Sequence, residues 1–119
     1  MAWVCFLSHK IASQKCIAIL YRIFYNMCMN GIKLEWDEEK EKINIKKHGI
    51  SFSTAAFVFN DPNRLEYYDE EHSISEDRYA TIGLVGNVLT VIYTIRGETH
   101  RIISARIATK AERSAYYGN

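Results

Sequence analysis

Apolar and polar residues alternate along several short stretches of this chain, and alternation with a period of two predicts β-strands. A Gly-Asn pair at 86–87 and a Gly-Glu pair at 97–98 separate three of these stretches, which predicts two tight hairpins. The sequence therefore predicts a mainly antiparallel sheet of about four to five strands. The predicted strands are residues 32–36, 65–68, 78–85, 88–95 and 99–105.

A first helix is predicted over residues 38–48, directly after the first strand. Asp37 is a suitable N-cap, and acidic residues occupy the first turn while basic residues occupy the last, an order that complements the helix dipole. Gly49 supplies the left-handed backbone that commonly ends a helix. Both ends of this helix are therefore marked in the sequence.

Two further helices are predicted. One opens at Ser51 or Ser53, carries the most apolar run after residue 31 and stops at the Asp-Pro pair 61–62, so we expect it to pack on the sheet. The other opens at Thr109, where Glu112 three residues later completes a capping box. The predicted fold class is α+β, with two N-terminal helices and a C-terminal helix packed on the sheet.

The predicted turns assign the strand residues to two faces, because successive residues of a strand point to opposite sides. The first turn makes Val85 oppose Val88, and the second makes Thr94 oppose Arg101. Arg106 then has the opposite parity from Arg101, and a slip of one residue would reverse such an assignment. The expected core face holds Ile82, Leu84, Leu89, Val91, Tyr93 and Ile95, and the expected polar face holds Tyr79, Thr81, Thr90, Thr94, Arg96 and Arg101.

Arginines and a tyrosine on an open sheet face form a rigid array of hydrogen-bond donors. Such an array suits phosphate oxygens and stacking on nucleic-acid bases. The other interpretation is that the arginines pair with surface carboxylates, since exposed ion pairs are common and contribute little to stability. Candidate partners are Glu66, Glu70, Glu71 and Glu98.

The charge of the chain is unevenly distributed. A length of 119 residues with 48% apolar residues suits one domain with a small core, and the formal net charge is +1. Residues 1–28 carry three bases and no acid, residues 35–77 carry twelve acids against five bases, and residues 78–119 carry six bases against two acids. The C-terminal third is therefore locally basic and could face a phosphate backbone.

Residues 1–28 differ in composition and hold all three cysteines, at spacings that match neither a zinc motif nor a redox pair. Their apolar runs are too short for a membrane helix, and a signal peptide would place its charges ahead of the apolar block. We expect either a non-native extension, with translation starting at Met27 or Met29, or a disordered or helical arm that binds a partner or a membrane surface. The predicted folded domain is residues 29–119.

Two histidines are candidates for chemistry. His48 ends the first predicted helix, where either a capping role or a role as general acid or base would explain it. His72 lies in the acidic stretch 69–77, which is either a metal-binding cluster or a solvated loop, and no second histidine follows at helical spacing. The sequence has no glycine-rich phosphate loop and no HExxH motif, and we expect no metal and no cofactor.

Four ordered blocks resemble the BrnT toxins of type II toxin–antitoxin systems, which are compact ribonucleases with a RelE-like fold. The blocks are the EWD start, the KHG joint with the F..A..VF.DP helix, the RY.TIG strand and the IISAR.AT..E...Y ending. They cover about residues 32–117, and residues 1–28 lie outside the resemblance.

The resemblance implies mRNA cleavage in the cytoplasm, bacterial growth arrest and no membrane association. It also implies a small DNA-binding, BrnA-like antitoxin that neutralises the toxin, so that operator DNA is bound only through the antitoxin. Metal-free RNA cleavage needs the 2′-hydroxyl to attack the adjacent phosphate while cations stabilise the developing charge. Fixed guanidinium groups suit this task.

Position and residue type assign the expected roles. The arginines would stabilise charge, and His48 or a tyrosine would accept the proton. One alternative is a catalytically inactive module of the same fold that binds RNA or an antitoxin, and another is a membrane-surface protein that uses residues 1–28. The predicted catalytic residues are Arg96, Arg101, Arg106 and His48, the predicted substrate-binding residues are Arg78, Tyr79 and Lys47, and no metal ligand is predicted.

Overall fold

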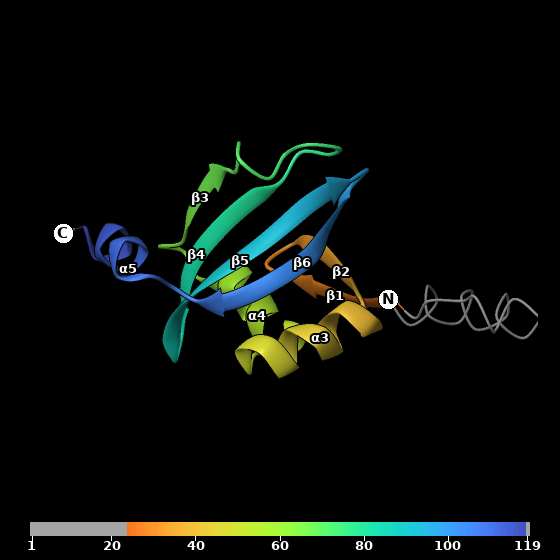
Figure 1. Ribbon diagram of the computed structural model, residues 1–119, viewed down its shortest axis with the longest axis horizontal. Coiled ribbons are helices and arrows are strands. Elements are labelled where there is room, and N and C mark those ends of the chain that lie inside the picture. The colour runs from red at the N-terminus through yellow and green to blue at the C-terminus, as the bar shows by residue number, and fades with distance from the viewer. Residues whose placement is uncertain (1–23, 119) are drawn as a thin grey trace, which may run out of the picture.

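The computed structural model of the protein describes residues 24–118 and confirms the α+β class (Figure 1). The first helix matches its prediction residue for residue, and the last helix carries the predicted capping box. In chain order the elements are β1 (Phe24–Met29), β2 (Ile32–Asp37), α3 (Glu38–His48), α4 (Phe52–Ala55), the 3₁₀ helix η1 (Ala56–Asn60), β3 (Leu65–Tyr68), β4 (Tyr79–Val85), β5 (Asn87–Arg96), β6 (Thr99–Ile107) and α5 (Lys110–Tyr117).

Six strands form one sheet in the order β1-β2-β6-β5-β4-β3. Every neighbouring pair is antiparallel except β2 and β6, so the mainly antiparallel prediction is confirmed. The predicted number of strands is wrong because β1 pairs with β2 along its full length. Asn30 and Gly31, with φ of 54° and 82°, make the tight turn between them, and this Asn-Gly hairpin signal was missed.

β1 begins at Phe24, before the predicted domain boundary at residue 29. Part of the predicted extension is therefore a strand of the sheet, and the rest lies outside the described residues. Within residues 24–118, no helix has the length and apolar character needed to cross a membrane.

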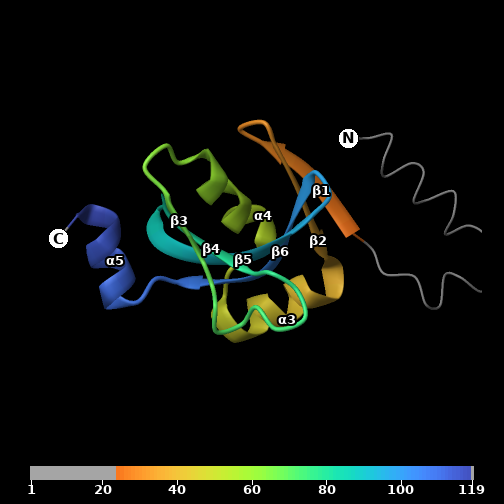
Figure 2. The same ribbon diagram turned by 90° about the horizontal axis from the view of Figure 1, so that it is seen from above.

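The two faces of the sheet are covered differently, as Figure 2 shows with α4 on one side and α3 on the other. α4 and η1 pack on the face that we call the core face. Gly83 on β4 lets η1 approach closely, since a Cβ there would lie 2.7 Å from Cγ1 of Val58. The buried residues of this layer include Leu34, Phe52, Val58, Phe59, Val91, Tyr93 and Ile102.

The opposite face, which carries Thr90, Thr94 and Arg101, we call the open face. α3 crosses it beside β6, and a small apolar cluster lies where α5 meets β4. The middle of this face, between α3 and the loop before β4, is not covered by a helix (Figures 1 and 2). The small cluster consists of Ile82, Val88 and Ala108, with Leu65 and Tyr116 packed against them.

The predicted register between β4 and β5 is wrong by one residue. Val85 pairs with Asn87 instead of Val88, because Gly86, at φ 74°, makes the reversal alone. The slip places every β4 side chain on the face opposite to the predicted one, since alternate residues of a strand face opposite sides. Ile82 and Leu84 therefore lie on the open face, whereas Tyr79 and Thr81 lie on the core face.

The predicted pairing of Thr94 with Arg101 is confirmed, but the predicted parity of Arg106 is wrong. Ile102 opposes Tyr93 and Ser104 opposes Ile92, so Ile103 is an extra residue in β6. This β-bulge restores Arg106 to the open face, opposite Thr90. Strand alternation alone cannot reveal such an insertion.

Asn44 fixes α3 against β6. Its buried side-chain amide donates to the carbonyls of Ala105 and Ile50, at 3.0 and 2.9 Å, and accepts from the N–H of Ala105 at 3.1 Å. Gly49, at φ 75°, then ends the helix. This anchor holds the C-terminal end of α3, and with it His48, beside the bulged part of β6.

Candidate functional site

An open hollow of about 300 Å³ lies on the open face between the end of α3, the loop before β4, and strands β5 and β6. We call it the arginine hollow. Its volume is at the lower end of ordinary small-ligand clefts. It is lined by His48, Asp69, His72, Arg78, Ile92, Ile103, Ser104 and Arg106.

Arg106 is held by Glu112 of α5 in a two-pronged contact. Nη1 lies 2.7 Å from Oε1 of Glu112, and Nη2 lies 3.0 Å from Oε2. Thr90 and the N–H of Thr109 also donate to Oε1, so the carboxylate is fixed from three sides. The hydrogen bond from Arg106 holds the pKa of Glu112 at about 2 although the carboxyl is partly buried. The guanidinium is therefore charged and well oriented beside the hollow.

Arg78 presents a different arrangement at the same hollow. Its Nε–H is buried and has no hydrogen-bond partner within residues 24–118, and its Nη2 lies 4.0 Å from Oε2 of Glu76. Its backbone N–H donates to Oγ of Ser73 at 2.8 Å, which fixes the loop. A buried donor without a partner is unfavourable unless a ligand accepts from it. Arg78 therefore keeps unused donor capacity at the wall of the hollow.

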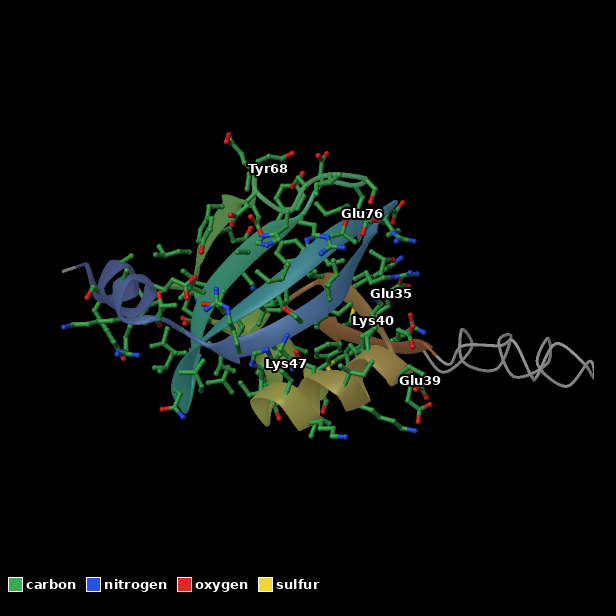
Figure 3. The ribbon with its side chains drawn as sticks, viewed as in Figure 1. Glu35, Glu39, Lys40, Lys47, Tyr68 and Glu76 are labelled. Atoms are coloured by element: carbon green, nitrogen blue, oxygen red, sulfur yellow. The ribbon has the colours of Figure 1, made fainter. Side chains whose placement is uncertain are left out.

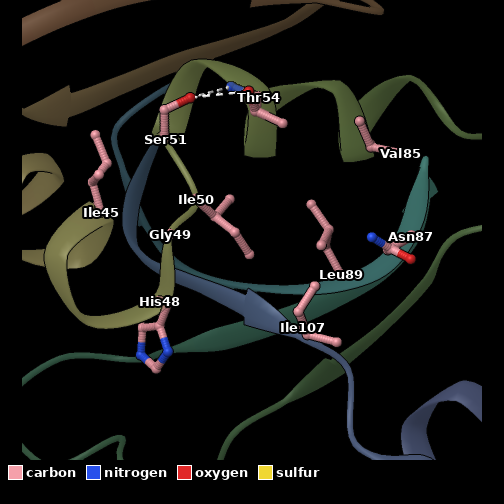
Figure 4. A pocket seen from close by; sticks show the side chains of 10 residues that line it. All are labelled: Ile45, His48, Gly49, Ile50, Ser51, Thr54, Val85, Asn87, Leu89 and Ile107. Atoms are coloured by element: carbon pink, nitrogen blue, oxygen red, sulfur yellow. Dashed lines mark hydrogen bonds between the residues drawn. The ribbon is translucent and has the colours of Figure 1, made fainter.

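Two histidines from distant parts of the chain line the hollow. His48 comes from the end of α3, and in Figure 4 its ring is directed away from the apolar side chains of Ile50 and Leu89. His72 comes from the loop before β4, and its Nδ1 lies 2.9 Å from Oδ2 of Asp69. Such a contact fixes which ring nitrogen faces the carboxylate and leaves the other available.

His48 also lies at the edge of a pocket of about 430 Å³ that opens between α3, α4 and the end of the β4–β5 hairpin (Figure 4). Its polar lining side chains are His48, Ser51, Thr54 and Asn87, and the contact between Ser51 and Thr54 caps α4. The other lining residues include Ile45, Ile50, Val85, Leu89 and Ile107. This pocket lacks the charged side chains of the arginine hollow.

Arg96 and Arg101 lie on the open face but line neither the arginine hollow nor the pocket of Figure 4. Arg96 contacts Glu76 at 3.0 Å, and Arg101 contacts Glu35 at 2.6 Å through both Nε and Nη2. Figure 3 places both carboxylates toward the β5–β6 hairpin, away from Lys47 on α3. The expected pairing with carboxylates therefore occurs, although the partners differ from those predicted.

Tyr79 lies on the core face, which the sequence did not predict. Its ring stacks on Tyr93 with centroids 5.6 Å apart, and Tyr93 stacks in turn on His100 at 4.9 Å. Burial lowers the pKa of His100. This row of rings is part of the packed layer beneath η1, so Tyr79 is separated from the arginine hollow by the sheet.

Lys47 lines a second hollow of about 270 Å³ on the open face, which we call the lysine hollow. It continues from the arginine hollow, because His48, Ile103 and Ser104 line both. Its other lining residues are Lys40, Ile43, Asn44 and Lys47.

Sequence reasoning missed several of the lining residues. Ser104 reaches both hollows only because of the bulge, which leaves no signal in the alternation, whereas Ile103 has the same parity as Arg101. His72 lies in a loop with its side chain 61% exposed, as the solvated-loop interpretation expects, and the structure also brings it to the arginine hollow with Asp69. Within residues 24–118, no three histidine, cysteine or acidic side chains come together as a metal site would require.

These features define a class of small α+β proteins that carry a basic hollow on an open sheet face. Residues 36–112 match the family described as the ribonuclease toxin, BrnT, of type II toxin-antitoxin systems. Because the match covers well over half of the chain, the protein belongs to this family, and the resemblance seen in the sequence is confirmed. Membership of a type II toxin–antitoxin family implies an antitoxin partner.

The fold supports the same assignment. The crystal structure of the Brucella abortus ribonuclease toxin BrnT, at 1.1 Å resolution, is similar with a TM-score of 0.50 and 25% sequence identity. The similarity covers 71% of this chain and 100% of the Brucella chain. No curated protein matches the chain.

Proposed function

We propose that this protein is a metal-independent endoribonuclease that cleaves mRNA in the arginine hollow. The observation that carries the proposal is the convergence of His48, Arg78 and Arg106 on one hollow. They come from three separate parts of the chain, and all three were predicted site residues. Family membership supports ribonuclease activity in general, and the hollow supplies the groups for one mechanism of it.

In the proposed reaction the 2′-oxygen of one nucleotide forms a bond to the phosphorus of the next phosphate. The bond from phosphorus to the 5′-oxygen breaks, leaving a 2′,3′-cyclic phosphate and a 5′-hydroxyl. Negative charge grows on the non-bridging oxygens as the phosphorane forms, so positioned donors stabilise this state most. Arg78 and Arg106 would hold these oxygens from two sides of the hollow.

Two proton transfers accompany this displacement, and the two histidines would carry them. One histidine removes the proton from the 2′-hydroxyl, and the other protonates the departing 5′-oxygen. His72 is held by Asp69, as a general acid or base commonly is, whereas His48 is held by the end of α3. Which histidine accepts the first proton depends on the direction in which the RNA lies.

Arg96 and Arg101 take a different role in this proposal. Both share the open face with the hollow but are engaged with carboxylates outside it. We assign them to the RNA on the β5–β6 hairpin side of the cleaved phosphate, where contacts affect binding more than the chemical step. Tyr79 is left out of the proposed site because its ring lies on the core face.

An inactive module of the same fold that binds RNA or an antitoxin is the second candidate. The observation that favours it is that Arg96, Arg101 and Arg106 each contact a carboxylate, as purely structural arginines do. The arginine hollow with its two histidines favours the enzyme. An assay of cleavage separates the two directly.

The test uses the purified full-length chain, single-stranded RNA labelled at its 5′ end, and EDTA. We expect cleavage products ending in a 2′,3′-cyclic phosphate, and a rate lowered about 10²-fold or more by His48→Ala or His72→Ala. Lys46→Ala, on the same helix as His48 but outside both hollows, serves as the control and keeps the wild-type rate. Binding of RNA without cleavage by the wild-type chain would support the inactive module instead.

We further propose that the partner is a DNA-binding, BrnA-like antitoxin that neutralises the toxin in the cytoplasm and carries the complex to operator DNA. The acidic segment 35–77 supports this, since it offers a surface for a basic partner. Expression of the chain alone should arrest bacterial growth, and co-expression of the antitoxin should restore it. Unchanged growth on expression of the chain alone would contradict the proposal.

A further inference from the structure

We propose that the lysine hollow is a second nucleotide site, and that Ile103 separates the bases of the two nucleotides that flank the cleaved phosphate. The inference rests on the proposed ribonuclease function and adds to it which hollow binds which nucleotide. The arginine hollow takes one nucleotide of a single-stranded RNA, and the lysine hollow takes its neighbour.

The geometry that carries this inference is the β-bulge in β6. The bulge inserts Ile103 into the strand and presents it next to Ser104 on the same face. These two residues and His48 are the lining residues that the two hollows share. A phosphate bound on the side of the arginine hollow that adjoins the lysine hollow would therefore lie over the residues they share, beside the imidazole of His48. It would have a nucleotide-sized space on each side, of about 300 and 270 Å³.

The lysine hollow has the chemistry of a nucleotide site. Lys40 and Lys47 lie seven residues apart, two turns along the same side of α3, and neither forms an ion pair with a described residue. By contrast, Lys42 on the same helix contacts Glu38 at 3.5 Å. Ile43, which is 63% exposed, offers an apolar surface on which a base can rest. Exposed cations beside an exposed apolar side chain suit a sugar–phosphate chain and one unstacked base.

Separating the two bases helps the reaction directly. The 2′-oxygen, the phosphorus and the departing 5′-oxygen must lie nearly in line for the displacement, and stacking of adjacent bases restricts the backbone rotation that aligns them. An isoleucine between the bases removes that stacking. Ile103 would then act as a positioning residue, because it touches the bases and leaves the reacting atoms to the histidines and arginines.

The test uses DNA oligonucleotides that contain a single ribonucleotide, so that cleavage can occur at one phosphate only. A matched set replaces the base on the 3′ side of that phosphate, or the base on the 5′ side, with an abasic sugar. Single-turnover rates and KM are measured with the wild-type chain, Ile103→Ala, Ile103→Val and Ile107→Ala. Ile107 lies on the same strand but lines neither hollow, so it controls for loss of an isoleucine from β6.

We expect Ile103→Ala to lower the single-turnover rate on the intact oligonucleotide about 10- to 100-fold, with little change in KM. Ile103→Val should recover much of the rate, and Ile107→Ala should keep it. On either abasic oligonucleotide the effect of Ile103→Ala should shrink to a few-fold or less, since no pair of bases remains to be separated.

An Ile103→Ala effect of equal size on intact and abasic oligonucleotides would overturn the inference, and so would no effect at all. In both cases cleavage by the wild-type chain would leave the proposed function standing. A wild-type chain that cleaves no RNA and no chimeric oligonucleotide would overturn both.

A separate measurement tests whether RNA occupies the lysine hollow. Lys40→Ala and Lys47→Ala should each raise KM several-fold, and should lessen the dependence of KM on salt, because each removes a cation near a phosphate. Lys46→Ala removes the same charge from the same helix outside the hollow and should leave KM unchanged. Equal KM values for all three variants would mean that the RNA does not occupy the lysine hollow.

Discussion

The core face and the open face of the sheet use the same strands for opposite purposes. On the core face, Phe59 and Val91 are completely buried among rings and aliphatic side chains, and the ion pair of Arg64 and Glu66 lies at its β3 edge. On the open face, Thr90 and Thr94 are also buried, but each donates its hydroxyl to an acceptor, Oε1 of Glu112 and the carbonyl of Asp77. Stability therefore comes chiefly from the core face, whereas these two hydroxyls of the open face are buried with partners.

The difference explains why the proposed site lies on the open face. A charged group on the core face would lose its hydration without recovering it, whereas the open face keeps its arginines partly in solvent and beside carboxylates. Arg106, with 34% of its side chain exposed, is held by Glu112 rather than by packing. Partly exposed pairs of this kind contribute modestly to the free energy of unfolding, but they fix the direction of the guanidinium. Substitutions on the two faces should thus separate stability from activity.

The largest effect is expected on the core face. Phe59→Ala should lower the free energy of unfolding by about 3–5 kcal/mol, because it removes a fully buried ring and leaves a cavity. Phe57→Ala removes the same ring from the same 3₁₀ helix at a position that is 49% exposed, and should cost less than about 1 kcal/mol. Urea unfolding measures both values. Similar losses for the two variants would mean that η1 does not pack as described.

The next effect belongs to the open face and concerns rate. Arg78→Ala should lower kcat about 10²–10³-fold, as expected for loss of a donor to the developing charge, with little change in the urea midpoint. Arg96→Ala also removes a partner of Glu76, but outside the hollow, and should raise KM a few-fold while kcat holds. Kinetics of RNA cleavage compare the two. A greater loss of kcat in Arg96→Ala than in Arg78→Ala would indicate that the reacting phosphate lies nearer the β5–β6 hairpin than proposed.

A smaller effect concerns the pH dependence of stability, through the contact between Glu112 of α5 and Arg106 on the open face. The pKa of Glu112 is about 2 in the folded protein, below its ordinary value of 4.5, because Arg106 donates to it. A carboxyl with a depressed pKa stabilises the fold above its unfolded pKa, and this contribution is lost as pH falls from about 4.5 toward 2. After allowance for solvent screening we expect ~1–2 kcal/mol.

The measurement is urea unfolding between pH 6 and pH 2 for the wild-type chain and Glu112→Gln. Glutamine can still complete the capping box, but it does not titrate. Its profile should therefore be flatter than that of the wild type in this window. Parallel profiles for the two proteins would show that Glu112 carries no stabilising charge.

The smallest effect is expected at Tyr79. Tyr79→Phe keeps the ring that stacks on Tyr93 and should leave the rate of RNA cleavage within about two-fold of wild type, since the hydroxyl lies on the core side of the sheet. The measurement is the rate of RNA cleavage by Tyr79→Phe and by the wild-type chain. A loss of ten-fold or more would place a substrate contact on the core face and remove the distinction between the two faces.

Several elements were predictable because their signals are local. The helix over residues 38–48 is flanked by the two residues that define its ends. The side chain of Asp37 accepts from the N–H of Glu39 at 2.9 Å, and Gly49 has left-handed backbone. The Thr109–Glu112 capping box and the hairpin that pairs Thr94 with Arg101 are local in the same way. His48, Arg78 and Arg106 could be named from residue type and position, although not as neighbours.

By itself, the sequence determined which segments are helices, where they end, and which side chains could handle a phosphate. The tertiary structure alone decided the arrangement of the proposed site, since β4 slipped by one residue, Ile103 bulged out of β6, and His72 came to line the same hollow as His48. Register and bulges depend on packing between distant segments. The amide of Asn44 bonding to Ala105, 61 residues away, is one such contact, and no local pattern encodes it.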